Sequence, residues 1–154
     1  MTAIETTTVI TVVFRNIFRY ARTPAEIDEL IDQIVTDPPG RTCGVYLWDR
    51  PCLSFREPDG PAFPDGRLRV TSETGIGWGA LNYVHRTQDD GALVDSFNPD
   101  ADETTPVVPF DPEGGIQFPR SASLPLDQVR DAVAEFCRTG ARPTCVRWQP
   151  GEWF

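Results

Sequence analysis

The sequence contains no lysine and a single histidine, His85, and these two shortages exclude several kinds of catalytic chemistry. Without lysine there can be no Schiff base and no lysine in a phosphate-binding loop. The metal-ligand spacings HxxxH and CxxC are also missing, as are the HxE and PCxxC elements of nucleobase deaminases. The sequence therefore favours a binding protein over an enzyme, and we expect no cofactor.

Long apolar runs are absent as well. No stretch approaches the roughly 18 consecutive apolar residues that a membrane-spanning helix needs. The N-terminus lacks the basic segment and apolar stretch of a signal peptide, so we expect a cytoplasmic protein without a membrane partner. In that compartment Cys43, Cys52, Cys137 and Cys145 are expected to be buried thiols rather than disulfides. The 154 residues suffice for one domain, residues 1–154, with its own hydrophobic core.

The most regular pattern, over residues 121–149, predicts a helix followed by a strand. Apolar residues recur at steps of three and four, which places them in one helical stripe: Leu126, Val129, Val133, Phe136 and Cys137. Pro125 suits the first turn, Ser123 is close enough to cap the helix, and Gly140 marks its end. Residues 144–149 then alternate as a strand does. A helix tied to a strand in this way is a good nucleus for an α+β domain.

A second helix is predicted near the N-terminus. The run Thr23-Pro24-Ala25-Glu26 reads as a capping box with proline at the first helical position. The apolar stripe that follows consists of Ile27, Leu30, Ile31 and Ile34. Before it, Thr6–Phe14 is apolar on both faces, so we expect a central strand. Between strand and helix, Ile17, Phe18 and Tyr20 are expected to fold over the edge of the core.

The middle of the chain alternates as strands do. The expected strands are Cys43–Trp48, Arg67–Thr71, Ile76–Arg86 and Ala92–Phe97. The turn Asp89-Asp90-Gly91 is typical of a hairpin, and strands joined in this way pair antiparallel. Residues 98–115 show no periodicity, and loops of this length are usually functional or disordered. The prediction is an α+β fold with a mostly antiparallel sheet of about five to seven strands and two helices packed on it.

Two short motifs have the spacing of ligand sites but lack the required context. Gly75–Ala80 has the spacing of a dinucleotide-binding loop, yet the residues after it alternate like a strand instead of starting a helix. Asn98, Asp100 and Asp102 have the spacing of a calcium-binding loop, but Glu103 stands where that loop needs glycine. We therefore expect neither a bound dinucleotide nor a bound calcium ion.

Negative charge is concentrated in one part of the chain. The formal net charge is −9 at pH 7, and the segment from Glu73 to Glu113 carries nine acids against one base, Arg86. Nucleic acid and anionic membranes are poor partners for such a segment, whereas a basic protein surface is a natural one. The alternative is that these acids only keep the protein soluble.

One ordered set of residues resembles a known family. The set consists of Trp78-Gly79-Ala80-Leu81-Asn82-Tyr83, Phe118-Pro119, Leu124-Pro125-Leu126-Asp127-Gln128-Val129, Glu135-Phe136-Cys137-Arg138-Thr139-Gly140-Ala141-Arg142-Pro143 and Val146-Arg147-Trp148. In this order it is similar to the first immunity-protein family of bacterial polymorphic toxin systems, the group found beside deaminase toxins. The resemblance implies an α+β domain that binds a cognate toxin non-covalently, without catalysis or a cofactor. The matching residues look like scaffold, so they do not define the toxin-facing surface.

Acidic residues are the candidates for that surface. A toxin that deaminates nucleic acid needs a basic groove around its zinc pocket, and an acidic partner can cover that groove. The candidate partner-binding residues lie at the predicted hairpin tip and in the following loop: Asp89, Asp90, Asp100, Asp102 and Glu103. The runner-up surface is the acidic face of the first helix: Glu26, Asp28, Glu29 and Asp32. We expect one basic nucleic-acid (cytosine) deaminase domain per immunity protein, and no direct contact with nucleic acid.

Two other functions stay open at this point. One is a small-ligand-binding or regulatory α+β domain in which Trp48, Trp78 and Tyr83 line a pocket. The other is a hydrolase that uses His85, for which the sequence shows no nucleophile arrangement. If apolar contacts rather than charges carry a protein interface, Trp48 and Trp153 are the residues to consider.

Overall fold

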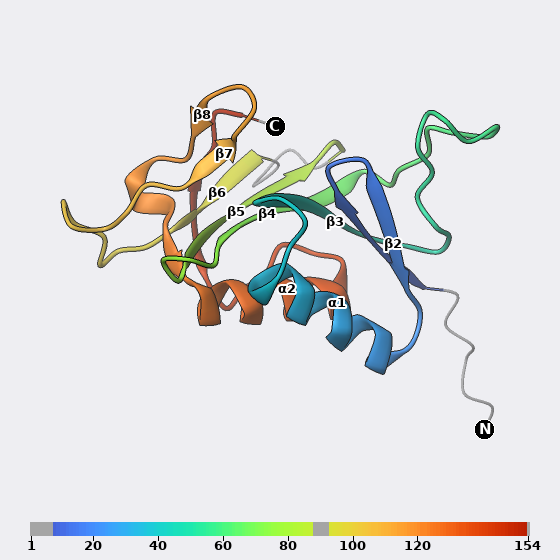
Figure 1. The fold of residues 1–154 in the computed structure, drawn as a ribbon, viewed down its shortest axis with the longest axis horizontal. Helices are drawn as coiled ribbons and strands as arrows, with labels where there is room; N and C mark the ends of the chain where they lie inside the picture. The colour runs from blue at the N-terminus through green and yellow to red at the C-terminus, as the bar shows by residue number, and fades with distance from the viewer. Residues whose placement is uncertain (1–7, 88–92, 154) are drawn as a thin grey trace.

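One antiparallel sheet carries both helices on the same face (Figure 1). The computed structural model describes residues 8–87 and 93–153. The strands of the main sheet are β1 (Val9–Phe14), β2 (Ile17–Ala21), β3 (Thr42–Trp48), β4 (Gly66–Glu73), β5 (Trp78–His85), β6 (Leu93–Phe97), β9 (Leu124–Pro125) and β10 (Arg147–Pro150). The other elements are α1 (Pro24–Thr36), α2 (Leu126–Thr139), the small hairpin of β7 (Pro109–Asp111) and β8 (Ile116–Gln117), and the 3₁₀ turn η1 (Arg120–Ala122).

Neighbouring strands of the main sheet all pair antiparallel, in the order β10-β6-β5-β4-β3-β1-β2. The short strand β9 pairs with β5 off this path and was not predicted. The predicted α+β fold, an antiparallel sheet with two helices packed on it, is confirmed. Strand β1 pairs with β3 on one side and β2 on the other, which also confirms its predicted central position.

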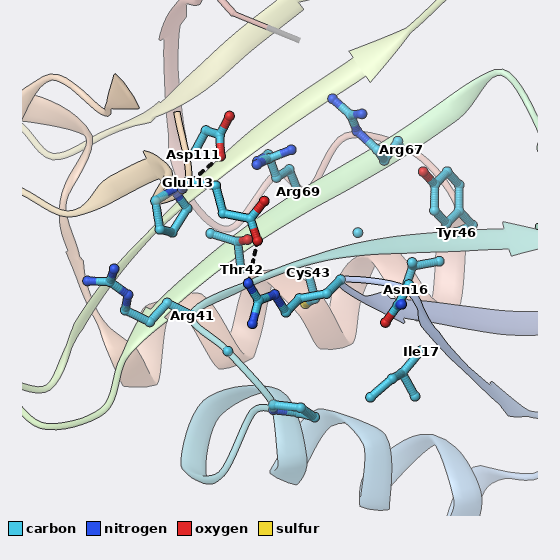
Figure 2. Close-up of a pocket in the computed structure, with 16 residues that line it drawn as sticks. Asn16, Ile17, Arg41, Thr42, Cys43, Tyr46, Arg67, Arg69, Asp111 and Glu113 are labelled. Atoms are coloured by element: carbon cyan, nitrogen blue, oxygen red, sulfur yellow. Dashed lines mark hydrogen bonds and ion pairs between the residues drawn. The ribbon is translucent and has the colours of Figure 1, made fainter. Parts of the chain in front are cut away.

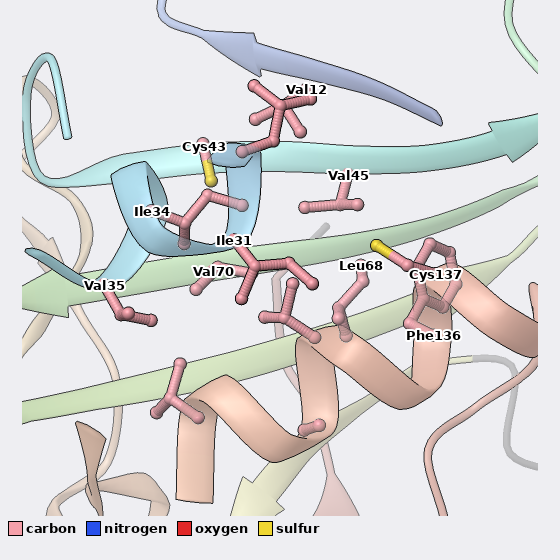
Figure 3. Close-up of a cluster of buried hydrophobic side chains, with 14 of the residues drawn as sticks. Val12, Ile31, Ile34, Val35, Cys43, Val45, Leu68, Val70, Phe136 and Cys137 are labelled. Carbon is pink, nitrogen blue, oxygen red and sulfur yellow. The ribbon is translucent and has the colours of Figure 1, made fainter. Parts of the chain in front are cut away.

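The main core lies between the sheet and the two helices (Figure 3). Every second residue of the central strands faces the helices, among them Val12, Val45 and Leu68, which are fully buried. The predicted stripe of α2 packs against them, and Phe136 is 1% exposed. Each Å² of apolar surface buried in this way contributes about 25 cal/mol. Apolar burial therefore holds both helices on one face of the sheet. Within the described residues, neither helix has the length and apolar character of a membrane span.

The two helices begin in different ways. At α1, the Thr23 hydroxyl accepts a hydrogen bond from the Glu26 N–H (3.2 Å), and the Glu26 carboxylate accepts one from the Thr23 N–H (3.1 Å). The capping box is therefore confirmed. The predicted cap of α2 by Ser123 is wrong, because this hydroxyl donates to a carbonyl of the preceding loop (2.6 Å). The chain enters α2 extended from β9, and the Leu126 N–H donates to the Gly77 carbonyl instead (3.1 Å).

Residues 17–21 form an edge strand and do not fold over the core as expected. They make up β2, in which Ile17 and Tyr20 are each 41% exposed. Strand β2 follows β1 through a two-residue turn in which Arg15 adopts a positive φ of 57°. Because arginine rarely adopts this conformation, the residue types around it do not indicate a turn.

A second, smaller core follows β6. Residues 98–115 were expected to lack regular structure, but β7 begins within this range and pairs with β8. Phe110 and Phe118 pack edge to face, with ring centroids 5.1 Å apart, and this cluster includes Ala80 of β5. Since Leu81 beside it faces the helices, Ala80 faces the other way. The second core therefore lies on the sheet face opposite to the helices (Figure 1).

Candidate partner-binding surfaces

The sheet face opposite to the helices is only partly covered. The second core covers one part of it, and the loop between β3 and β4, residues 49–65, projects at the other end (Figure 1). Beside the second core lies a pocket of about 1020 Å³. Its lining comes from the β1–β2 turn, the α1–β3 connection, strands β3 and β4, and residues 111–113 (Figure 2).

Arginine dominates the charged lining of this pocket. The charged side chains are Arg15, Arg41, Arg67, Arg69, Asp111 and Glu113. All of them except Arg15 are labelled in Figure 2. Two of the arginines are paired with carboxylates of the chain itself. Arg15 contacts Glu113, and Arg41 forms an ion pair with Glu73 at 3.2 Å. Both of these arginine side chains are more than half exposed, so the pairs contribute little to stability.

The other two arginines, Arg67 and Arg69, project from the same face of β4 because they are two residues apart. Arg69 donates to the Phe110 carbonyl from Nε (3.0 Å) and from Nη2 (2.7 Å), and its guanidinium carbon lies 4.4 Å from the centroid of the Phe110 ring. Arg67 has buried Nε and Nη2 atoms with no hydrogen-bond partner among the residues that the structure describes. One guanidinium thus anchors the second core, while the other has unused donors.

Burial and like charge act together on Arg69. Burial lowers the pKa of Arg69, and the neighbouring charge of Arg67 lowers it further. The Asp111 carboxylate acts in the opposite direction and raises it. The surroundings therefore disfavour two adjacent positive charges, and an anion placed beside them would reduce this electrostatic cost.

Sequence reasoning did not find this pocket, although part of its signal is visible. The alternation Arg67-Leu68-Arg69-Val70 places two apolar residues on the core face of β4 and two arginines on the other face. Arg15 and Arg41 lie far from β4 in the sequence, and only the strand order brings them next to it.

Three of the five acidic candidates are exposed on the loop that follows β6: Asp100, Asp102 and Glu103. The Asp102 carboxylate also shapes this loop, because it accepts hydrogen bonds from the hydroxyl (2.6 Å) and the N–H (2.8 Å) of Thr104. These bonds lower the pKa of Asp102, so the group is charged at neutral pH. The other two candidates, Asp89 and Asp90, lie outside the described residues.

The acids between Glu73 and Glu113 are dispersed over several environments. Asp95 is 4% exposed, accepts a hydrogen bond from the Asn82 side chain (3.0 Å), and has its pKa raised by burial. Asp111 and Glu113 line the arginine pocket, and Glu73 pairs with Arg41 beside it. A charge count along the chain therefore overstates the acidity of any one surface, because neighbouring strand residues face opposite sides of the sheet.

The runner-up surface on α1 is exposed along its length. Glu26 is occupied in the capping box, where the backbone N–H groups of Arg22 and Thr23 lower its pKa. Asp32 forms an ion pair with Arg130 of α2. The other two acids of this set, Asp28 and Glu29, take part in neither the capping box nor the ion pair.

The structure does not bring Trp48, Trp78 and Tyr83 into one pocket. Tyr83 is fully buried beneath α2, with its ring centroid 6.4 Å from that of Phe136. Trp78 packs against the second core on the other face of the sheet, and Trp48 stacks under the guanidinium of Arg50 (4.7 Å). The predicted aromatic pocket is therefore wrong.

Reactive side chains are few and scattered. Within residues 8–87 and 93–153, no three His, Cys, Asp or Glu side chains are grouped so that they could hold a metal ion. His85 accepts a hydrogen bond from the Thr87 N–H at Nδ1 (3.3 Å) and lines a small hollow of about 400 Å³. All four cysteines are free; three are buried as expected, whereas Cys145 is exposed. Burial raises the pKa of Cys43 and of Cys137 to about 12, so both thiols stay protonated.

The chain thus combines an α+β fold with an arginine-lined pocket and an exposed acidic loop. Comparison with known protein families matches residues 18–150 to the family described as Immunity protein Imm1. The match covers most of the chain, and the chain therefore belongs to the Imm1 immunity protein family. Membership confirms the resemblance to immunity proteins and supports a protein that binds and neutralises a cognate toxin. The chain has no match among curated proteins or among solved structures.

Proposed function

We propose that this immunity protein neutralises a nucleic-acid deaminase toxin, with cytosine as the target base, by covering the substrate groove of the toxin with an acidic surface. That surface consists of Asp100, Asp102 and Glu103, together with Asp89 and Asp90. One immunity protein binds one toxin domain in the cytoplasm of the producing cell. The observation that supports this proposal best is the joint exposure of Asp100, Asp102 and Glu103 within a single loop.

The charge of the toxin follows from its substrate. An enzyme that acts on nucleic acid presents positive charge to the phosphates, and a deaminase holds the target base in a zinc pocket. Carboxylates on a loop beside a rigid sheet can occupy the positions of phosphates without offering a base for reaction. The net charge of −9 also attracts a basic toxin, which raises the association rate at low salt.

The double variant Asp100→Lys/Glu103→Lys is expected to associate with the toxin at least about tenfold more slowly at low salt. This variant keeps Asp102, so the hydrogen bonds from Thr104 to the Asp102 carboxylate, which shape the loop, are preserved. The matched control is Asp28→Lys/Glu29→Lys on α1, which changes the net charge by the same amount. Surface plasmon resonance with the toxin domain encoded by the neighbouring gene, at low and high salt, measures both association rates.

Three outcomes contradict parts of this proposal. If the α1 variant is the damaged one, the acidic site is misplaced although toxin binding stands. If neither variant is affected and association ignores salt, the electrostatic mechanism is wrong, and apolar contacts such as Trp153, which is 45% exposed, must carry the interface. If the purified toxin domain does not deaminate cytosine in nucleic acid, the proposed substrate is wrong.

The variant His85→Ala is expected to protect cells from the toxin as well as the parent chain does. His85 lies on β5, and among the described residues its side chain hydrogen-bonds to Thr87. The purified parent protein should likewise show no deaminase, nuclease or hydrolase activity. The measurement is survival of cells that express the toxin, with circular dichroism as the folding control. Loss of protection by a variant that still folds and binds the toxin would support an enzymatic role.

A further inference from the structure

We propose that the arginine pocket binds a carboxylate side chain, an Asp or Glu, that the toxin inserts between Arg67 and Arg69. The proposal rests on toxin binding but not on the acidic loop or on deaminase chemistry. The pocket lies on β3 and β4, whereas the acidic loop follows β6. The toxin would therefore be held at two places of opposite charge, which fixes its orientation as well as its affinity.

The floor of the pocket is shaped by a glycine. Gly44 of β3 is paired with Arg69 of β4, and its missing side chain leaves room on the open face. A Cβ at this position would lie 3.3 Å from the ring of Tyr46 and 3.6 Å from Cδ of Arg67. Glycine inside a strand often marks such a close approach. Gly44 therefore lies in contact distance of Arg67, whose Nε and Nη2 atoms are buried.

A buried guanidinium with unused donors is costly, because it has lost water without gaining a partner. The Arg67 side chain is partly buried, its Nε and Nη2 atoms are in this situation, and Arg69 beside it adds a second positive charge. A carboxylate supplies two acceptor oxygens in the planar geometry that a guanidinium matches. Binding of an acidic side chain would thus provide the missing hydrogen bonds and reduce the repulsion between the two arginines.

The chain already places carboxylates of its own at this pocket. Glu113 contacts Arg15, and Asp111 lines the wall formed by the second core. The side chains of Glu113 and Arg15 are 73% and 63% exposed, so this contact is weak and open to exchange. A carboxylate thus already lies at the rim of the pocket, while Nε and Nη2 of Arg67 have no hydrogen-bond partner among the described residues.

Two observations favour a protein carboxylate over a nucleic acid. The chain carries a net charge of −9, and Asp111 and Glu113 line the pocket, so a polyanion is repelled where a single acidic side chain is not. An exposed apolar side chain also accompanies the arginines, because Ile17 lines the pocket and is 41% exposed. Aromatic and aliphatic anchors around an arginine are typical of protein interfaces.

The decisive variant is Arg67→Met, which keeps an unbranched apolar stem and removes the charge. We expect its affinity for the toxin domain encoded by the neighbouring gene to fall roughly 30-fold or more. Its melting temperature should stay the same or rise, since an unpaired buried charge is removed. A purely structural arginine would instead lower the melting temperature. Arg138→Met, an exposed arginine on α2 far from the pocket, is the control and should bind as the parent does.

Calorimetric titration and thermal melting of these variants give both readouts. The result that overturns the proposal is parent-like toxin affinity of a folded Arg67→Met protein. A second experiment measures whether inorganic phosphate raises the melting temperature of the parent protein in the absence of toxin. Stabilisation by phosphate that disappears in Arg67→Met, with unchanged toxin affinity, would make this a small-anion site and also refute the proposal. Parent-like binding by Asp100→Lys/Glu103→Lys together with weak binding by Arg67→Met would reject the acidic-loop mechanism and support this one.

Discussion

Phe136→Ala is expected to lower the free energy of unfolding by about 3–5 kcal/mol. The Phe136 side chain is 1% exposed and belongs to the main core between α2 and the sheet. Its ring packs edge to face on that of Tyr83, with centroids 6.4 Å apart. Truncation removes these contacts and leaves a cavity that neither the helix nor the paired strands can close.

Urea or thermal unfolding of the purified variant measures this loss, and Phe55→Ala is the matched control. Phe55 is the same residue type but is 76% exposed, so its truncation should change stability by less than about 0.5 kcal/mol. Equal effects of the two substitutions would show that α2 does not pack on the sheet through its apolar stripe.

Gly79→Ala is the second substitution with a large expected effect, a destabilisation of about 1–3 kcal/mol or more. A Cβ added to Gly79 would lie 2.3 Å from the Thr71 carbonyl oxygen and 3.1 Å from a methyl group of Val129. The first of these atoms is backbone and cannot rotate away. The sheet and α2 approach too closely here for any side chain, so β4, β5 or α2 has to shift.

Gly75→Ala provides the comparison within the same motif. No heavy atom lies within 4 Å of a Cβ at Gly75, and its φ is not positive, so the substitution should be close to neutral. Melting temperatures of the two variants, measured side by side, test the difference. A Gly79→Ala protein as stable as Gly75→Ala would mean that Thr71 and Val129 lie farther from position 79 than described.

The glycines of this motif also show which structural features can be predicted from the sequence and which cannot. The alternation of residues after Gly79 predicts a strand, and a strand at this place argues against a dinucleotide-binding loop, which needs a helix there. The reason for a glycine at position 79 is tertiary, because it depends on Thr71 and Val129, which belong to β4 and α2. Local patterns predict elements, whereas close approaches between elements become visible only in the fold.

The same limit explains the fold predictions that failed. Both helices follow from periodic apolar stripes and from the capping box at Thr23, all of which are local signals. Strand β2 depends on Arg15 in a conformation that arginine rarely adopts, and β7 and β8 are too short to show periodicity. Ser123 has the right residue type for a cap, but pairing of β9 with β5 directs it elsewhere.

For the candidate binding surface, the sequence shows which charged residues a segment contains but not where their side chains lie in the fold. Glu73 to Glu113 is acidic as a segment, yet Asp95 is buried and Asp111 faces arginines. The arginine pocket gathers side chains from β4, the β1–β2 turn and the α1–β3 connection. These arginines are far apart in the sequence. Counting charges along a segment therefore cannot predict that they gather in one pocket.

The strand order has a consequence for the newly synthesised chain. Strands β3, β4 and β5 each pair with the next strand in the sequence, and local pairing of this kind speeds folding. Helix α2, however, emerges from the ribosome only after all of these strands. Until then a large part of their apolar face has no cover, and such surface promotes aggregation. The cover of this face is therefore complete only once α2 has been translated.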